Sequence, residues 1–354
     1  MLSRAWLEID LAALVRNASK LAGHSGVALI PMVKADAYGL GAVPVANALE
    51  TLSPMAYGVA TVDEGRELRS AGIAREIIVF TPLLESDFPE AASLSLTPTL
   101  GFPTAIDSWK IYGSPYYLSV DTGMHRAGIP WRDVSSLSPV LQANPPNGVF
   151  THFHSPELDD ETMGIQLERF DQALKHLPSI PALVHTDSSA AIVRHERSAM
   201  SAVRPGIFMY GVGSGDTARF QPDPVVYMRG RIVEIRNVHA GDTVSYDATW
   251  TASKPGRIAT VPLGYADGYP RNASNRGVAV VRGKTAPIAG RVTMDMTMLD
   301  VTETGAEVGD VATLIGDPRG SGTPIDVASV AKLADMSPYE LLTGLRNRIE
   351  RIYK

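Results

Sequence analysis

One lysine closes the first apolar segment of the chain. Lys34 follows the run Val27-Ala-Leu-Ile-Pro-Met-Val and precedes Ala-Asp-Ala-Tyr-Gly. Burial among apolar groups disfavours the charged form of an amine, which lowers its pKa and makes the amine a nucleophile for Schiff-base formation. The alternative is a surface lysine whose stem packs at the end of a strand. The position of Lys34 alone favours neither interpretation.

Two arginines lie in glycine-containing motifs that suit anions. Arg204 precedes Pro-Gly-Ile, where backbone amides could hold a phosphate and Ser189 could add a hydroxyl. Arg126 lies in Asp121-Thr-Gly-Met-His-Arg and could hold a carboxylate through its bidentate fork. Taken singly, the Arg204 motif is also typical of an ordinary strand-to-turn junction, and Arg126 could equally be a solvent-facing arginine.

Histidines and a tyrosine supply further groups that could bind a metal or move a proton. No Asp or Glu completes a ligand set with His152, His154 and His185, so we predict neutral, hydrogen-bonding histidines and no metal. Tyr265, in Gly264-Tyr-Ala-Asp-Gly-Tyr, could transfer a proton if its pKa is depressed. The alternative for that motif is a turn with packed aromatic rings.

Short apolar segments alternate with helix-like segments over residues 1–218. Strands rich in Val, Ile and Leu, each followed by a helix, indicate a parallel sheet, and eight such units close a (β/α)8 TIM-type barrel. Functional residues of a barrel lie at the carboxyl ends of its strands, where Lys34, Arg126, His152, His185 and Arg204 fall. The predicted strands are 27–34, 55–61, 76–80, 94–97, 116–120, 148–152, 182–185 and 201–204. The predicted helices include 43–52, 64–71 and 162–176, with Asp63 as the expected cap of the second.

Residues 219–354 are predicted to form a mostly β C-terminal domain. Val, Ile and Thr there alternate with Gly, Asp and Pro turns, which indicates strands at 229–236, 256–262, 277–281 and 310–315. Late helices are expected at 325–334 and 338–345. Residues 213–224 are the natural linker, and residues 1–10 are expected to form a strand that joins the C-terminal domain.

Composition excludes several classes of protein. The chain has 354 residues, 45% hydrophobic and 20% charged, which allows two domains with sizeable cores. A net charge of -6 disfavours nucleic acid as a partner, and the absence of cysteine excludes disulfides and thiolate chemistry. The first residues do not have the apolar character of a signal peptide, and no apolar run is long enough to span a bilayer. We therefore expect a cytoplasmic protein with no membrane partner.

Together, the motifs resemble those of the alanine racemase family over essentially the whole chain. The most specific segments are Val33-Lys-Ala-Asp-Ala-Tyr-Gly, Asp121-Thr-Gly-Met-His-Arg-Ala-Gly, Val203-Arg-Pro-Gly-Ile, Gly264-Tyr-Ala-Asp-Gly-Tyr-Pro and Gly290-Arg-Val-Thr-Met-Asp. The resemblance implies a pyridoxal 5′-phosphate-dependent isomerase that racemises L- and D-alanine. It also implies a head-to-tail homodimer with shared active sites.

The resemblance implies a role for each motif residue. Lys34 would bear the cofactor as a Schiff base and serve as base for the D-substrate, and Tyr265 of the partner subunit would be the base for the L-substrate. Substrate would also meet Arg126 and, from the partner subunit, Met294 and Asp295. The remaining residues would surround the cofactor. Arg204 would lie at the pyridine nitrogen, and His152 and His185 near the ring, with His152 also hydrogen-bonded to Tyr265 or Arg204. The phosphate would be held by Tyr38, Ser189, Gly206, Ile207 and Tyr339.

The implied roles fit the chemistry of racemisation. The reaction removes a proton from one face of the α-carbon and returns it to the other, so two bases must flank one carbon. An arginine stays protonated, so Arg204 can only donate to the ring nitrogen and discourages its protonation. This arrangement suits a racemase better than a transaminase or a decarboxylase.

Two positions depart from the family pattern. Ser119 stands seven residues before Arg126, where the family usually has a lysine that becomes carbamylated and pairs with that arginine. A serine cannot carry that negative charge, so either a bound anion such as chloride takes its place or Arg126 is held more loosely. We predict no carbamylated lysine at this site. Thr293 replaces a small thiol that many relatives have before Met294.

Three alternatives remain beside an alanine racemase. A serine or broad-specificity racemase is one alternative, because the size of the substrate pocket cannot be read from the sequence. A non-catalytic barrel that binds the same cofactor would lack the C-terminal domain, with its Tyr265 and Met294. A decarboxylase on a similar barrel is disfavoured by Arg204 and by the absence of cysteine.

Overall fold

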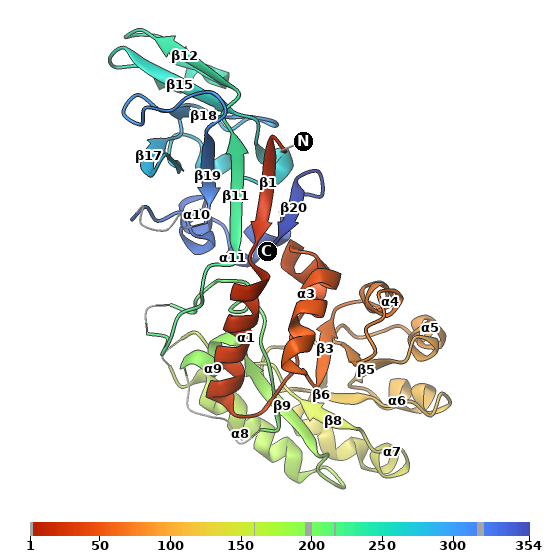
Figure 1. Cartoon of the computed structure of the whole chain (residues 1–354). Coiled ribbons are helices and arrows are strands. Elements are labelled where there is room, and N and C mark those ends of the chain that lie inside the picture. The colour runs from red at the N-terminus through yellow and green to blue at the C-terminus, as the bar shows by residue number, and fades with distance from the viewer. Residues whose placement is uncertain (1–2, 159, 195–199, 216, 317–321) are drawn as a thin grey trace.

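The computed structural model describes residues 3–158, 160–194, 200–215, 217–316 and 322–354. It forms a parallel barrel, in the lower part of Figure 1, and a set of β-sheets above it. No helix in these ranges is long and apolar enough to cross a membrane.

The barrel is built from eight parallel strands in the described part of the chain. Their order is β2-β10-β9-β8-β6-β5-β4-β3, and a bridge between Met32 and Gly58 brings the two ends of that order together. The predicted (β/α)8 barrel is therefore confirmed. The strands are β2 (Ala28–Leu29), β3 (Ala56–Val59), β4 (Glu76–Val79), β5 (Leu96–Leu100), β6 (Tyr117–Asp121), β8 (Gly148–Phe150), β9 (Leu183–Ser188) and β10 (Ala202–Arg204), and the short β7 (Ile129–Pro130) pairs with β6.

Helices surround these strands on the outer face (Figure 1). They are α1 (Leu11–Ser25), α3 (Ala42–Leu49), α4 (Val62–Ser70), α5 (Phe88–Ser93), α6 (Pro103–Lys110), α7 (Ser138–Ala143), α8 (Thr162–Lys175) and α9 (Ser189–Arg194). Asp10 caps α1 by accepting a hydrogen bond from the Ala13 amide at 2.7 Å. The prediction that Asp63 caps α4 is wrong, because the Thr61 hydroxyl accepts from the Glu64 amide. Helix α4 therefore begins at Val62, two residues before the predicted start.

The first predicted strand is shorter than expected. The segment 27–34 was predicted as one strand, but only Ala28–Leu29 is regular, and Lys34 begins a separate turn. Pro31 explains the interruption, because proline has no amide to donate to a neighbouring strand. The segment 229–236 was likewise predicted as one strand and is two, β11 (Val226–Arg231) and β12 (Glu234–Val238).

The second part of the chain is mostly β. Its six-stranded sheet has the order β17-β16-β19-β11-β1-β20, in which β1 (Ala5–Ile9) from the N-terminus lies between β11 and β20 (Figure 1). Leu7 and Ile9 are fully buried, and alternate residues of β1 face the same core. The other strands are β13 (Thr243–Val244), β14 (Trp250–Thr251), β15 (Gly256–Val261), β16 (Val278–Val281), β17 (Lys284–Pro287), β18 (Thr297–Asp300), β19 (Val311–Ile315) and β20 (Glu350–Tyr353).

Two short helices, α10 (Val327–Leu333) and α11 (Pro338–Thr343), complete the C-terminal part. Helix α11 packs against the segment that follows Lys34, since Gly39 lies against the backbone of Leu342. A β-carbon at Gly39 would come within 2.4 Å of the Leu342 carbonyl oxygen, and its φ of +82° also favours glycine. The C-terminal part therefore reaches the mouth of the barrel through α11.

Candidate active site

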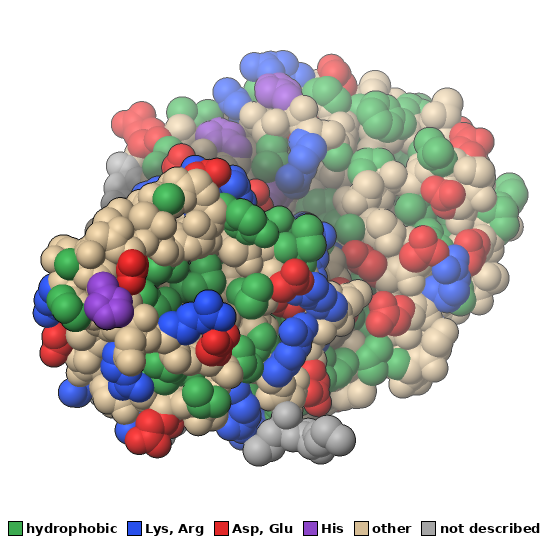
Figure 2. Space-filling model, turned by 90° about the horizontal axis from the view of Figure 1, so that it is seen from above, with side chains coloured by type: hydrophobic (Ala, Val, Ile, Leu, Met, Phe, Trp, Pro, Cys, Tyr) green, Lys and Arg blue, Asp and Glu red, His purple; other side chains and the backbone are tan. Residues whose placement is uncertain are grey.

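A cavity of about 1110 Å³ opens at the carboxyl ends of the barrel strands. Lys34, Arg126, His152 and Arg204 line it, and Tyr339 of α11 contributes from the C-terminal part. The face seen from above carries acidic and basic side chains interspersed with one another (Figure 2). The cavity lies where the barrel fold is expected to place its functional groups.

Lys34 is held at the rim by a left-handed turn. Ala35, Asp36, Ala37 and Tyr38 all have φ between 51° and 57°, a conformation that costs an L-residue roughly 1–2 kcal/mol each. Two carboxylates stabilise this turn. Glu64 accepts from the Ala35 amide at 2.8 Å, and Asp36 accepts from the Ala42 amide at 2.7 Å.

The electrostatic surroundings of Lys34 favour its neutral form. Its side chain is half-buried, and burial is the largest cause that lowers its pKa. The positive charge of Arg126 lowers the pKa further, Glu64 opposes this, and Arg204 adds a smaller lowering. A larger fraction of the Lys34 amine is therefore neutral and available as a nucleophile than in an exposed lysine.

Hydroxyl and amide groups converge near Gly206 to form a cradle. The Ser189 hydroxyl accepts from the Gly206 amide at 2.8 Å and from the Phe208 amide at 3.4 Å. A β-carbon at Gly206 would lie 2.5 Å from the Tyr38 hydroxyl, so only glycine leaves this space open. Ile207 is buried behind it, and the ring of Tyr339 lies 6.0 Å from that of Tyr38. Neutral donors around an open space suit a phosphate group.

Arg204 lies buried inside the barrel mouth. It donates to the carbonyl oxygens of Thr151 at 2.7 Å, Thr186 at 2.9 Å and His185 at 3.0 Å. Its Nη1 also lies 2.5 Å from His185 Nδ1, and its Nη2 lies 3.3 Å from His152 Nδ1. Burial lowers the pKa of Arg204 to about 10, so the side chain remains a cation at neutral pH.

The two histidines beside Arg204 are neutral. Burial, followed by the charge of Arg204, lowers the pKa of His152 to about 3 and that of His185 well below its ordinary value. The ring of His185 stacks on that of Phe150, with ring centroids 5.2 Å apart, and His185 does not itself line the cavity. The described residues contain no group of three or more side chains that could hold a metal.

Arg126 is the least constrained of the predicted residues. Its side chain is exposed at the cavity and makes no hydrogen bond or ion pair with any residue of the described ranges. Ser119 is buried nearby and lines the same cavity. A β-carbon at Gly128 would lie 2.7 Å from the Ser119 hydroxyl oxygen, so the chain after Arg126 passes closely over this serine.

Tyr265, Met294 and Asp295 do not line this cavity. Tyr265 opens the 3-10 turn η5 (Tyr265–Asp267) on the C-terminal part, and its amide donates to the Thr293 carbonyl at 3.0 Å. The side chains of Tyr265 and Met294 are 38% and 52% exposed. A single chain therefore does not bring these three residues to Lys34.

Sequence reasoning missed two residues that support the site. Glu64 holds the turn after Lys34 and also accepts from the Ala60 amide at 2.7 Å. Tyr210 stacks on Tyr38 with ring centroids 4.6 Å apart and donates to the Met32 carbonyl. The Thr61-x-x-Glu64 spacing is a helix-start signal that could have drawn attention to Glu64, whereas nothing local marks Tyr210.

The fold and the cavity define a two-domain barrel enzyme in which a lysine faces an anion cradle and a buried arginine. The chain belongs to the alanine racemase family. The model of the alanine racemase N-terminal domain matches residues 9–214, and that of the C-terminal domain matches residues 225–353. This is a family of isomerases.

Known relatives resemble the chain over its full length. Alanine racemase of Halothermothrix orenii is 37% identical over 99% of this chain and 96% of its own length. The crystal structure of alanine racemase from E. faecalis has a TM-score of 0.93 and 29% identity, and covers 99% of this chain and 98% of its own. That of alanine racemase from Bartonella henselae, with covalently bound pyridoxal phosphate, has a TM-score of 0.90 and 28% identity over 100% of both chains.

Proposed function

We propose that this chain is a pyridoxal-phosphate-dependent alanine racemase that uses Lys34 and Tyr265 of the partner subunit as its two bases. One observation carries the proposal: Lys34, the Gly206 cradle and Arg204 converge on a single cavity at the barrel mouth. The amine has a lowered pKa, and the cradle offers neutral donors to a phosphate. These are the groups that a covalently held phosphorylated cofactor needs.

The donor set fits pyridoxal phosphate. The phosphate would be held by the Gly206 amide and by the Ser189, Tyr38 and Tyr339 hydroxyls, beside Ile207. Arg204 would donate to the ring nitrogen, and Lys34 would hold the cofactor covalently. When bound, the cofactor supplies an electron sink for the charge left at the α-carbon.

The residues of the chain would then bind substrate and move its proton. Arg126 would take the substrate carboxylate through its exposed fork. Lys34 Nζ would exchange the α-proton on one face, as the base for the D-substrate. Tyr265, the base assigned to the opposite face, lies outside the cavity of its own chain.

A head-to-tail dimer would supply the second base. We assign residues 219–354 to a domain that presents Tyr265, Met294 and Asp295 of the partner subunit to the barrel of residues 1–218. The exposure of Tyr265, Met294 and Met296 supports this assignment, because three large apolar side chains on one domain favour burial in an assembly. Fully active monomers at high dilution would overturn it.

Chiral product analysis over a panel of L-amino acids tests the reaction and its substrate together. We expect D-alanine to form fastest, with slower turnover of L-serine. Lys34→Ala should abolish racemisation, and borohydride reduction of the holoenzyme should attach the cofactor to the Lys34 peptide. Full activity in Lys34→Ala, or no D-product from any amino acid, would refute the proposal.

A further inference from the structure

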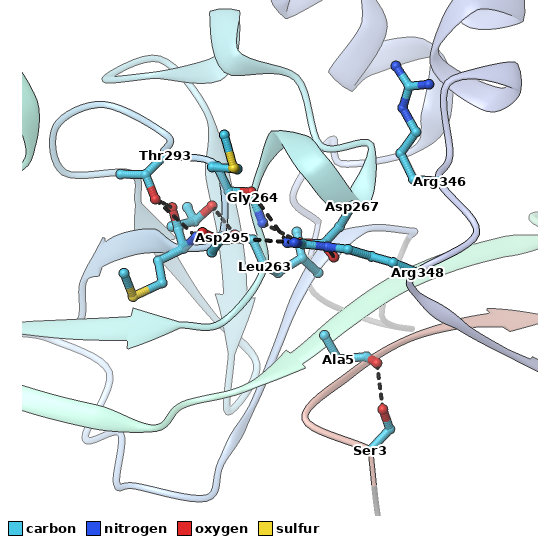
Figure 3. A network of polar contacts seen from close by, with 12 residues as sticks. Ser3, Ala5, Leu263, Gly264, Asp267, Thr293, Asp295, Arg346 and Arg348 are labelled. Atoms are coloured by element: carbon cyan, nitrogen blue, oxygen red, sulfur yellow. Dashed lines mark hydrogen bonds and ion pairs between the residues drawn. The ribbon is translucent and has the colours of Figure 1, made fainter.

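Arg348 links two turns of the C-terminal part that are distant in the sequence. It lies between α11 and β20, and its guanidinium contacts two carboxylates (Figure 3). Nε and Nη2 donate to the two oxygens of Asp267 at 2.7 and 3.0 Å, and Nη1 donates to Asp295 at 2.8 Å. Asp267 raises the pKa of Arg348 most, followed by Asp295. All three nitrogens of the guanidinium thus donate to carboxylate oxygens.

Asp267 fixes the turn that carries Tyr265. Its side chain is 4% exposed and also accepts from the Gly264 amide at 2.8 Å, directly before Tyr265. Without Arg348, this carboxylate would be a buried charge with only one amide donor, which is an unfavourable state. The Arg348 contact therefore helps to fix the Tyr265 turn, beside the hydrogen bond from the Tyr265 amide to the Thr293 carbonyl.

Through Nη1, Arg348 also contacts the loop that carries Met294. Asp295 follows Met294, and the Met294 carbonyl accepts from the Ala266 amide at 3.0 Å and from Arg348 Nη2 at 3.5 Å. Gly264 lies so close to this loop that a β-carbon there would be 2.3 Å from the Thr293 carbonyl oxygen. Backbone hydrogen bonds and the Arg348 contacts therefore hold the Tyr265 turn and the Met294 loop together as one unit.

The same unit is attached to the segment that directly follows α11. The Arg346 amide donates to the Asp267 carbonyl at 3.2 Å, and a β-carbon at Gly268 would lie 2.8 Å from the Gly344 carbonyl oxygen. Helix α11 carries Tyr339, which lines the cavity of its own chain. The segment from α11 to Arg348 thus lines the cavity of its own chain through Tyr339 and also holds the residues that are assigned to the partner's cavity.

We propose that Arg348 is a positioning residue that sets the place of Tyr265 and Met294 in the active site of the partner subunit, acting through Asp267 and Asp295. This inference rests on the proposed function, in which Tyr265 is the base for the L-substrate. A displacement of the Tyr265 hydroxyl would slow proton removal on that face and leave Lys34 in place on the other. A purely structural ion pair would affect both faces equally.

The test compares α-proton exchange from L- and D-alanine in deuterium oxide, using the holoenzyme. Arg348→Gln should slow exchange from L-alanine by about 10- to 100-fold, the scale expected for a misplaced catalytic group. Exchange from D-alanine should stay within about twofold, since Lys34 is untouched. Arg348→Lys should fall between Gln and the natural residue, because an ammonium cannot bridge both carboxylates.

Matched variants make the test specific. Arg346→Gln is the control, since Figure 3 shows its side chain pointing away from the network, and its exchange rates should not change. Asp295→Asn removes the exposed carboxylate contact of Arg348 and keeps the inference testable if Arg348→Gln does not fold; because Asp295 is also assigned to the substrate site, its effect is compared with that of Arg348→Lys. Cofactor absorbance and sedimentation should show a loaded dimer in each variant.

The outcomes separate this inference from the proposed function. Tyr265→Phe should show the same selective loss of exchange from L-alanine, in larger measure. If Tyr265→Phe slows both enantiomers equally, the two-base proposal fails and this inference fails with it. If Tyr265→Phe is selective while Arg348→Gln and Asp295→Asn slow both enantiomers equally or neither, only the role of Arg348 is overturned.

Discussion

Arg204 and His185 form one hydrogen-bonded unit at the floor of the barrel mouth, with Nη1 and Nδ1 2.5 Å apart. Because an arginine can only donate, His185 Nδ1 accepts and the ring proton must be on Nε2. That Nε2 is buried and has no hydrogen-bond partner in the described residues. The site therefore keeps a neutral imidazole beside a fixed cation.

Replacing Arg204 with lysine should destabilise the fold. An ammonium cannot reach the Thr151, His185 and Thr186 carbonyls together, so buried acceptors lose their donors. We expect the free energy of unfolding in urea to fall by about 2–4 kcal/mol. The exposed Arg236→Lys should change it by less than about 0.5 kcal/mol. Equal stabilities of the two variants would contradict this account of Arg204.

Acidification should weaken the protein through its buried histidines. His152 has a pKa of about 3 in the folded chain against an ordinary 6.5, so the unfolded chain binds the proton more readily. Stability is then lost as the pH falls from 6.5 toward 3, by up to about 1.4 kcal/mol per pH unit for each such histidine. His152→Asn should flatten urea unfolding measured as a function of pH over this range. If the dependence of the unfolding free energy on pH were the same in His152→Asn, His152 would be excluded as a source of the acid sensitivity.

Gly206→Ala should weaken cofactor retention. Its β-carbon would lie 2.5 Å from the Tyr38 hydroxyl and occupy the cradle. Titration of the apoprotein with pyridoxal phosphate should show binding weakened by about tenfold or more, which is about 1.4 kcal/mol. Gly164→Ala in α8 is the control, because its β-carbon meets nothing within 4 Å. Equal affinity in both variants would rule out this place for the phosphate.

Activity should not depend on carbon dioxide. Ser119 has no amine that could form a carbamate, and Arg126 makes no ion pair with the described residues. Rates in bicarbonate-free and bicarbonate-supplemented buffers should therefore agree, and native mass spectrometry should show no carbon dioxide adduct on any lysine. Chloride titration then shows whether an anion supports Arg126, because chloride bound there should change the KM for alanine. A bicarbonate requirement would contradict the role assigned to Ser119.

The sequence predicted the barrel because each strand carries its own local signal. Apolar β-branched residues mark the strands, and Lys34, His152 and Arg204 end such segments, so their convergence follows from the topology alone. The left-handed turn after Lys34 could not be predicted in this way. Its residues Ala35 to Tyr38 include no glycine, and their conformation depends on Glu64, which approaches from the next βα unit.

Arg348 shows the limit of local reasoning most clearly. It lies in Leu345-Arg-Asn-Arg-Ile, which has no motif character, and its partners Asp267 and Asp295 lie 81 and 53 residues away. A contact of this kind is specified only by the packed fold. The motif around Tyr265 was visible in the sequence, whereas the arginine that holds it was not.

The pairing of strand β1 determines when the β-sheet of the C-terminal part can be completed during synthesis. Strand β1 pairs in parallel with β20, so that Trp6 lies opposite Glu350, which is made much later in the chain. At about 5–20 residues per second, translation separates these partners by on the order of 20–70 s. Leu7 and Ile9 are fully buried in the finished molecule; β11 can pair with them earlier, but the β20 side of β1 stays uncovered for that time. A nascent chain in which β20 has not yet been made leaves one edge of β1 unpaired and should therefore be the species most in need of a chaperone.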